Sequence, residues 1–411
     1  MKNSLAILFF LVVNVTAYAQ KDQLDHYLNQ AKANSPLLKD YQNQVRSSLY
    51  DSLLIRAAYK PQVTGSSNNS YSPVYMGWGY DAAITNGGNF SALIGINKQL
   101  LNKKVVAAQF ENLQLQNQSL NNSSKITEQD LKRAITAQYI ATWGDLQQLN
   151  FDKEINTLLS HEETILKKLT QQNVYKQVDY LAFLVTLQQQ EFIMKQQEIQ
   201  FKFDYAGLNY LSGINDTTAV DLQKPDLTPG QLPDITHSVF FRQYELDSLK
   251  LNNSKTIVAM AYKPRVNLFA DGGFLSSLAY NPYKNFGTSF GINAVIPIYD
   301  GRQMKLQYSK IAIAQKTREN NKLFFADQYK QQIAQLTQQL HATAELIENI
   351  KAQLKYTRSL IEVNGKLLDA GEVRVTDYIL ALNNYITAMN LVTQNNISSL
   401  QIINQLNYWN R

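Results

Sequence analysis

The residue types that most often carry chemistry are sparse in this sequence and poorly spaced for it. The chain has no Cys, which excludes disulfides, thiolate metal sites and cysteine nucleophiles. The four histidines lie too far apart for a helical metal-ligand pair; they are His26, His161, His237 and His341. No nucleophile, glycine-rich phosphate loop or metal motif accompanies the acidic residues. We therefore expect no enzyme activity, no metal and no cofactor.

Charge argues against a nucleic-acid partner. The 411 residues include 39 basic and 33 acidic side chains, a formal net charge of +6. Because these charges are spread along the chain rather than clustered, they provide no basic patch for a phosphate backbone. We expect no binding of nucleic acid.

Residues 1–19 predict a signal peptide. Lys2 supplies a positive charge, Leu5 to Val13 form an apolar run, and Ala17 and Ala19 fit an A-x-A cleavage site. The run is too short for a stable membrane anchor, and no later stretch has the length of an apolar transmembrane helix. The mature chain is expected to begin at Gln20 and to be exported.

Proline placement predicts very long helices. The tracts 74–224 and 298–411 contain no Pro, although the chain has nine, and an interior Pro costs a helix about 3 kcal/mol. A helix from about Lys103 to about Thr170 would be roughly 100 Å long. In the second tract, heptad a and d positions are mostly apolar: Ile333, Leu336, Leu340, Thr343, Ile347, Ile350, Leu354, Thr357, Ile361, Asn364 and Leu368. A weaker seam runs through Leu131, Ile135, Tyr139, Thr142, Leu146 and Leu149. These patterns indicate coiled-coil packing, as in a helical barrel or an ordinary soluble bundle.

Four short motifs recur in the same order at a spacing close to 200 residues, which indicates a tandem duplication. The first copies are Tyr59–Pro61, Gly95–Asn97, Val178–Tyr180 and Leu208–Tyr210, and the second copies are Tyr262–Pro264, Gly291–Asn293, Thr376–Tyr378 and Leu406–Tyr408. We expect a first repeat over 20–211, a connector over 212–233 and a second repeat over 234–411. In each repeat one β-hairpin should interrupt the helices, at about 61–101 and about 264–299, with long helices at about 103–211 and about 303–409.

The second hairpin alternates apolar and polar residues with the period of a strand. We expect Leu268, Ile292, Ile296 and Ile298 to face lipid, with Asn267 and Asn293 on the opposite, lumenal face. A soluble sheet packed on a helix would show the same alternation. Aromatic residues near the predicted tips favour a membrane interface; they are Tyr71, Tyr75, Trp78, Tyr80, Tyr280 and Tyr283.

Two hairpins provide four strands, too few to close a transmembrane barrel, and unpaired strand edges in lipid are costly. Three copies would supply twelve. The fold expected is therefore mainly α with a β-barrel portion: a long coiled-coil helical barrel joined to a transmembrane barrel, four strands per chain and twelve in a homotrimer.

With these features, the sequence resembles the TolC-like outer-membrane efflux proteins. The likeness covers nearly the whole mature chain and includes the duplicated order of elements, the Lys-Pro entry to each hairpin and the segment Ile298–Arg302 at the exit of the second. The resemblance implies a homotrimeric channel in the outer membrane of a Gram-negative cell, with a long periplasmic extension. It also implies a periplasmic adaptor protein and an inner-membrane pump as partners. The exported substrate could be small molecules or other cargo of a tripartite efflux or type I secretion system.

The same resemblance implies that two helix-to-helix turns, 173–178 and 371–376, form the periplasmic entrance. Turn residues that match the family are Asn173, Val174 and Gly371, whereas Tyr175 replaces a usual Gly. Asp179, Arg374 and Asp377 are the charges that would close the entrance or attract cations, and they also suit ordinary helix starts. The alternative to a channel is a soluble periplasmic coiled-coil scaffold or adaptor without a barrel.

Overall fold

The computed structural model describes residues 23–79, 87–100, 103–216, 218–231, 235, 238–277 and 281–409. The predicted signal peptide 1–19 lies outside these ranges. The chain divides into two compact units. The helical unit comprises Met1–Lys39, Ser124–Val239 and Phe324–Arg411, and the strand unit comprises Asp40–Ser123 and Phe240–Leu323.

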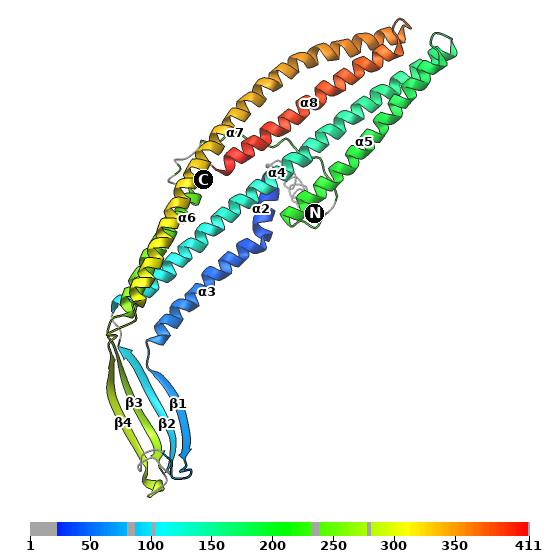
Figure 1. Ribbon diagram of the computed structural model, residues 1–411. Coiled ribbons are helices and arrows are strands. Elements are labelled where there is room, and N and C mark those ends of the chain that lie inside the picture. Colours follow the sequence, from blue (N-terminus) through cyan, green and yellow to red (C-terminus); the bar gives the residue numbers. More distant parts are fainter. Residues whose placement is uncertain are drawn as a thin grey trace, which may run out of the picture. The chain divides into compact units, whose positions relative to one another are not determined.

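Very long helices and two β-hairpins make up the structure, which confirms the fold class predicted from the proline-free tracts (Figure 1). The first half contains α2 (Gln23–Asn34), α3 (Pro36–Ala58), β1 (Gln62–Ser72), β2 (Gly87–Leu100), α4 (Lys103–Gln171) and α5 (Gln177–Ser212). The second half contains α6 (Val239–Ala261), β3 (Arg265–Ser276), η3 (Pro282–Lys284), β4 (Phe286–Val295), α7 (Gln303–Asp369) and α8 (Val375–Tyr408). The helices α4 and α7 have 69 and 67 residues. No helix among the described residues is both long enough and apolar enough to cross a membrane.

The core of the helical unit lies along the predicted seams. All eleven heptad positions of α7 are at least half-buried, and the fully buried ones are Leu336, Ile347, Ile350, Thr357, Ile361 and Leu368. On α4, Tyr139 and Leu146 pack in one apolar cluster with Phe201 of α5. A Cβ atom on Gly144 of α4 would lie 2.3 Å from Ile397 Cδ1 of α8. The absence of a side chain at Gly144 therefore permits this close contact between the two helices.

The strand unit contains one antiparallel sheet in the order β1-β2-β3-β4. The two hairpins join through β2 and β3, which pair over eleven positions from Phe90↔Ser276 to Leu100↔Val266. Gly273 allows this close pairing, because a Cβ there would lie 2.2 Å from the carbonyl oxygen of Ala92. Strands β1 and β4 form the two edges, so each has one side without a strand partner in this sheet.

The last strand is shorter than expected. The alternation of apolar residues suggested a strand continuing to Tyr299, but β4 ends at Val295. Pro297 explains the difference, because it has no N–H to donate to a ladder. Ile296 and Ile298 therefore lie beyond the strand, in the connection to α7, with 62% and 96% of their surface exposed. Their assignment to a strand was wrong.

Candidate functional site: the two-faced sheet and the paired helix turns

The strand register divides the sheet into an apolar and a polar face. Side chains directly opposite each other on antiparallel strands share a face. The pairs Ile96↔Ala270 and Leu268↔Ile292 therefore place their side chains together, and Asn267↔Asn293 lies on the other side. The apolar face includes Ile94, Ile96, Leu268, Ala270, Phe290 and Ile292, and the polar face includes Asn97, Gln99, Asn267, Asp271, Ser289 and Asn293.

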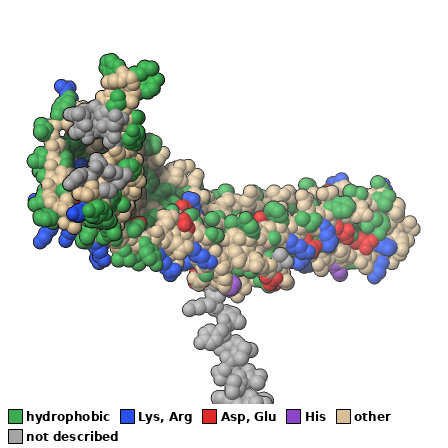
Figure 2. Space-filling view, turned by 90° about the horizontal axis from the view of Figure 1, so that it is seen from below, with side chains coloured by type: hydrophobic (Ala, Val, Ile, Leu, Met, Phe, Trp, Pro, Cys, Tyr) green, Lys and Arg blue, Asp and Glu red, His purple; other side chains and the backbone are tan. Residues whose placement is uncertain are grey.

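The apolar face is not covered by this chain. Phe290 is 87% exposed and Ile292 is 71% exposed. Figure 2, which views the molecule from the strand end, shows hydrophobic side chains gathered over the strand region. Contiguous exposed apolar surface on a folded protein marks contact with a membrane or with another protein.

Specific contacts hold the polar face. The Ser289 hydroxyl donates to Asp271 Oδ2 at 2.7 Å between paired strands. Phe269 is an apolar residue on this face, and its ring lies over its cross-strand partner Gly291, where an added Cβ would approach to 2.7 Å. The edge strand β1 departs from the pattern in the opposite sense, because Ser67 and Asn69 align with the apolar face.

The two helix-to-helix turns are built alike. Asn173 and Gly371 each adopt a left-handed conformation, with φ of 61° and 75°. Each turn closes with a hydrogen bond to the helix just ended, from Val174 N to Leu169 O and from Glu372 N to Leu367 O. This geometry is the Schellman helix ending, in which Gly and Asn are favoured. Tyr175 has no positive φ, so its replacement of the family's Gly leaves the turn intact.

The turns also interlock. A Cβ on Gly371 would lie 2.6 Å from Val174 Cγ1, so any larger residue would push the turns apart. The Tyr175 hydroxyl donates to the carbonyl oxygens of Val373 at 2.8 Å and Leu368 at 3.1 Å. Of the predicted turn residues, Val174 is thus in contact with Gly371, and Asn173 lies next to Val174 in the chain. Tyr175 adds a second link between the turns, and the resemblance gave no reason to select it.

The three charged turn residues, Asp179, Arg374 and Asp377, form hydrogen bonds with residues close to them in this chain. Arg374 donates from Nε to Asp377 Oδ2 at 2.9 Å and from Nη2 to Asp377 Oδ1 at 3.1 Å. The Asp179 carboxylate accepts from the Lys176 backbone N–H at 3.3 Å. The predicted partnership of Asp179 and Arg374 is therefore not one that this chain makes with itself. Arg374 is 82% exposed at its side chain, which leaves it accessible to a neighbouring molecule.

A buried carboxyl group with an exposed acidic neighbour lies behind the turns, and sequence reasoning did not find it. Glu162 of α4 is 6% exposed, and its Oε2 atom has no hydrogen-bond partner among the described residues. Burial, together with the neighbouring Asp369 of α7, raises the pKa of Glu162 to about 7. The ring of Tyr378 from α8 is also buried here, and burial raises the pKa of its hydroxyl. Nothing in the sequence pairs these residues, because their meeting depends on how α4, α7 and α8 are rotated.

The described residues contain no group of His, Cys, Asp or Glu side chains that could hold a metal ion. Among the described residues, the candidate functional features are the sheet with one exposed apolar face and the pair of turns that contact each other and carry charged side chains.

Comparison with solved structures decides the fold. The outer membrane protein VceC from Vibrio cholerae matches with a TM-score of 0.75 and 11% identity, over 94% of this chain and 96% of that one. The CmeC outer membrane channel of Campylobacter jejuni matches with a TM-score of 0.71 and 14% identity, over 94% of this chain and 85% of that one. This chain has the TolC-like fold of outer-membrane channels.

A third structure with the TolC-like fold is the open state of the MtrE outer membrane channel of Neisseria gonorrhoeae. It matches with a TM-score of 0.70 and 11% identity, over 94% of this chain and 88% of that one. No family model matches the sequence, and no curated protein matches it. The matches to known proteins are thus matches of three-dimensional structure.

Proposed function

We propose that this chain is an outer-membrane channel that exports small molecules or other pump substrates as the outer component of a tripartite system. The exposed apolar face of the sheet carries the proposal. A soluble scaffold would have to cover Phe290 and Ile292, and they are largely exposed. The strands have the length of bilayer-spanning strands, 11, 14, 12 and 10 residues from β1 to β4.

The open edges of the sheet support a trimer. Backbone groups without partners cost several kcal/mol each in lipid, so β1 of one copy must pair with β4 of the next. Three copies would close a twelve-stranded barrel with the apolar face toward lipid. Asn267, Asn293 and the Ser289–Asp271 pair would then line the lumen and suit a water-filled pore. The long helices would extend into the periplasm of a Gram-negative cell.

The interlocked turns are proposed to form the periplasmic entrance. Closure would rest on ion pairs between copies. The exposed Arg374 of one copy would leave Asp377 of its own chain and pair with Asp179 of the neighbouring copy. Surface ion pairs are individually weak, but threefold symmetry repeats each one. An adaptor that binds the open state more tightly would then shift the population toward it.

The proposed partners are a periplasmic adaptor protein and an inner-membrane pump. The polar residues of α4 and α7 that lie outside the heptad seams would give an adaptor protein a broad surface to bind. Chemical crosslinking in cells, followed by purification of the trimer, would identify which adaptor and pump are bound. Recovery of the chain with soluble periplasmic proteins alone would favour the scaffold instead.

Single-channel recording in planar bilayers tests the proposed function. The purified parent should insert and give discrete conductance steps. A double variant, Asp179→Ala with Arg374→Ser, should give larger steps, because the proposed closing links are removed. Glu154→Gln, an exposed position on α4, serves as the control and should conduct like the parent. Absence of channels from every preparation in which the protein is folded would refute the proposal.

A further inference from the structure

Glu162 interrupts an apolar stretch of α4 close to the turns. It lies between Leu159 and Leu166 at the 3–4 spacing of a coiled-coil seam, and both leucines are fully buried. A Cβ added to Gly365 of α7 would lie 3.8 Å from Glu162 Oε1 and 3.7 Å from Tyr378 Cε2 of α8. The carboxyl group is therefore enclosed where α4, α7 and α8 meet, a place at which packed helices usually bury apolar side chains.

Glu162 has no ion-pair partner among the described residues. The titratable groups that act on it from the packed helices are Asp369 of α7, which is exposed, and the neutral hydroxyl of Tyr378, which is buried. Neither supplies a positive charge. Other side chains nearby bond elsewhere or are exposed: Tyr180 donates to Glu163, Arg374 donates to Asp377, and Lys167, Lys168 and Lys366 are exposed.

Two neighbouring carboxyl groups can hydrogen-bond to each other only through a proton, because an ionised carboxylate is an acceptor without a donor. Glu162 Oε2 is buried and has no hydrogen-bond partner among the described residues. Burial and the charge of Asp369 both favour the neutral form of Glu162. A proton on Glu162 would let its O–H donate to Asp369.

Asp369 lies directly beside the contact between the two turns. It is the last residue of α7, and the carbonyl oxygen of the preceding Leu368 accepts from the Tyr175 hydroxyl at 3.1 Å. Two residues further along, Gly371 lies against Val174. A hydrogen bond from α4 to Asp369 would therefore join the helix ends at the place where the turns already hold each other.

We propose that Glu162 and Asp369 bind one proton between them, and that this proton keeps the two turns together. With the proton, the carboxyl pair ties α4 to the end of α7. Without it, two like charges lie close together in a site from which water is largely excluded, and separation of the helix ends relieves their repulsion. This inference rests on the proposed function, because that proposal makes the turns the entrance of a channel.

Proton linkage gives the size of the effect. Burial and Asp369 raise the pKa of Glu162 to about 7, whereas a Glu in water has a pKa of about 4.3. Between these values the joined state holds a proton that the separated, hydrated state releases. Rising pH therefore favours separation, and its equilibrium constant should increase by about 30-fold from pH 5.5 to pH 8.5 if water fully reaches Glu162.

Amide hydrogen exchange of the detergent-solubilised full chain at pH 5.5 and pH 8.5 tests the proton site. Each rate is divided by the intrinsic exchange rate at that pH, so that protection is compared. In the parent, protection within 171–176 and 369–374 should fall by up to about 30-fold at the higher pH. Glu162→Gln supplies a permanent amide donor to Asp369, so protection in this variant should be the same at both pH values.

Two further variants locate the titration. His161→Gln replaces the exposed neighbour of Glu162, a residue type that ordinarily titrates between pH 5 and 8, and should keep the response of the parent. Asp369→Asn removes the like charge from an exposed position and offers an N–H donor to Glu162, so it should reduce the response. A parent without a response, a response unchanged in Glu162→Gln, or a response lost in His161→Gln would overturn the proton site.

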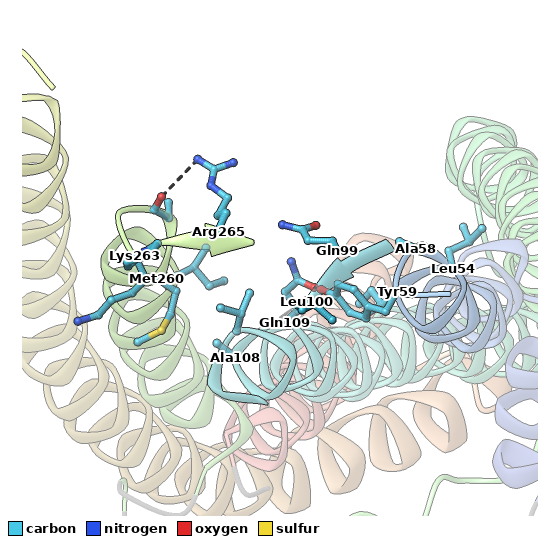
Figure 3. Close-up of a pocket in the computed structure, with 15 residues that line it drawn as sticks. Leu54, Ala58, Tyr59, Gln99, Leu100, Ala108, Gln109, Met260, Lys263 and Arg265 are labelled. Carbon is cyan, nitrogen blue, oxygen red and sulfur yellow. Dashed lines mark hydrogen bonds between the residues drawn. The ribbon is translucent and has the colours of Figure 1, made fainter. Parts of the chain in front are cut away.

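The cavity of the strand unit provides an internal reference in the same measurement. It has a volume of about 600 Å³, and its described lining residues include no Asp or Glu. Its charged lining residues are Lys263 and Arg265, whose side chains point in different directions in Figure 3. Protection of the lining segments 54–59 and 105–109 should therefore stay constant between the two pH values. An equal loss of protection there would mean that the whole chain loosens, which contradicts a local site.

Single-channel recording separates this inference from the proposed function. The parent should conduct more at pH 8.5 than at pH 5.5, and Glu162→Gln should lose this difference. Channels whose conductance and turn protection are both independent of pH would refute the proton site alone. A pH response of the turns that Glu162→Gln abolishes, in a folded protein that forms no channels, would support the proton site and refute the proposed channel.

Discussion

The hydroxyl of Tyr175 lies 2.8 Å from the carbonyl oxygen of Val373 and ties the turn between α4 and α5 to the turn between α7 and α8. Tyr175→Phe removes this donor and leaves the carbonyl oxygens of Val373 and Leu368 without it. Loss of a hydrogen bond costs about 0.5–1.5 kcal/mol. Amide hydrogen exchange should therefore accelerate in both turns at once.

The control for this prediction is Tyr180→Phe. The Tyr180 hydroxyl of α5 donates to Glu163 of α4, so its loss should not affect the turn between α7 and α8. If Tyr175→Phe accelerates exchange only in its own turn, the two turns are not coupled through this bond.

The faces of the sheet give a second prediction. Ile292→Arg places a charge on the apolar face, whereas Asn293→Arg places it on the polar face. A basic residue facing lipid near the midplane costs about 2–4 kcal/mol, and a lumenal one is tolerated. The folded fraction in outer-membrane preparations should fall for Ile292→Arg and stay at the parent level for Asn293→Arg. The reverse order would mean that the polar face is turned to lipid.

The buried Glu162 gives a third prediction, for pH dependence. Its pKa is raised to about 7 by burial and by Asp369, whereas an unfolded Glu has a pKa of about 4.3. Between these values the folded chain holds a proton that the unfolded chain releases, so stability falls as pH rises through this window. The melting temperature of the parent should decrease from pH 5 to pH 8.

Glu162→Gln should make this decrease smaller. Part of the decrease should remain, because burial and the neighbouring Asp204 also raise the pKa of Asp145 to about 7. Glu154→Gln, an exposed change on the same helix, should follow the parent curve. Identical curves for the parent and Glu162→Gln would show that Glu162 titrates normally.

Asp377 gives a fourth prediction. In the proposed trimer, three copies of this side chain converge near the axis of the entrance and favour cations over anions. Asp377→Ala should therefore shift the reversal potential in a salt gradient toward zero. An unchanged reversal potential would mean that selectivity is set elsewhere along the pore.

The sequence was sufficient to predict the periodic parts of this fold. Heptad spacing identified buried residues such as Ile350 and Ile361, because coiled-coil packing repeats with the sequence. Alternation likewise separated Ile292 from Asn293. The same alternation extended the last strand too far, because side-chain pattern says nothing about the missing N–H of Pro297.

The contacts within the candidate site were less predictable. Val174 touches Gly371, and Tyr175 bonds to Val373, because two distant turns of similar shape lie against each other. Glu162 lies beside Asp369 for the same kind of reason. Such contacts depend on the axial positions and rotations of packed helices, and a single sequence does not specify them pair by pair.

The central claim is that three copies of this chain close one barrel in a membrane. Mass photometry of the detergent-solubilised protein tests it most directly. The account predicts a particle with the mass of about three protomers plus a detergent micelle, because β1 and β4 need partners from other copies. A monomer that stays in solution without detergent, with the apolar face of its sheet exposed, would contradict it.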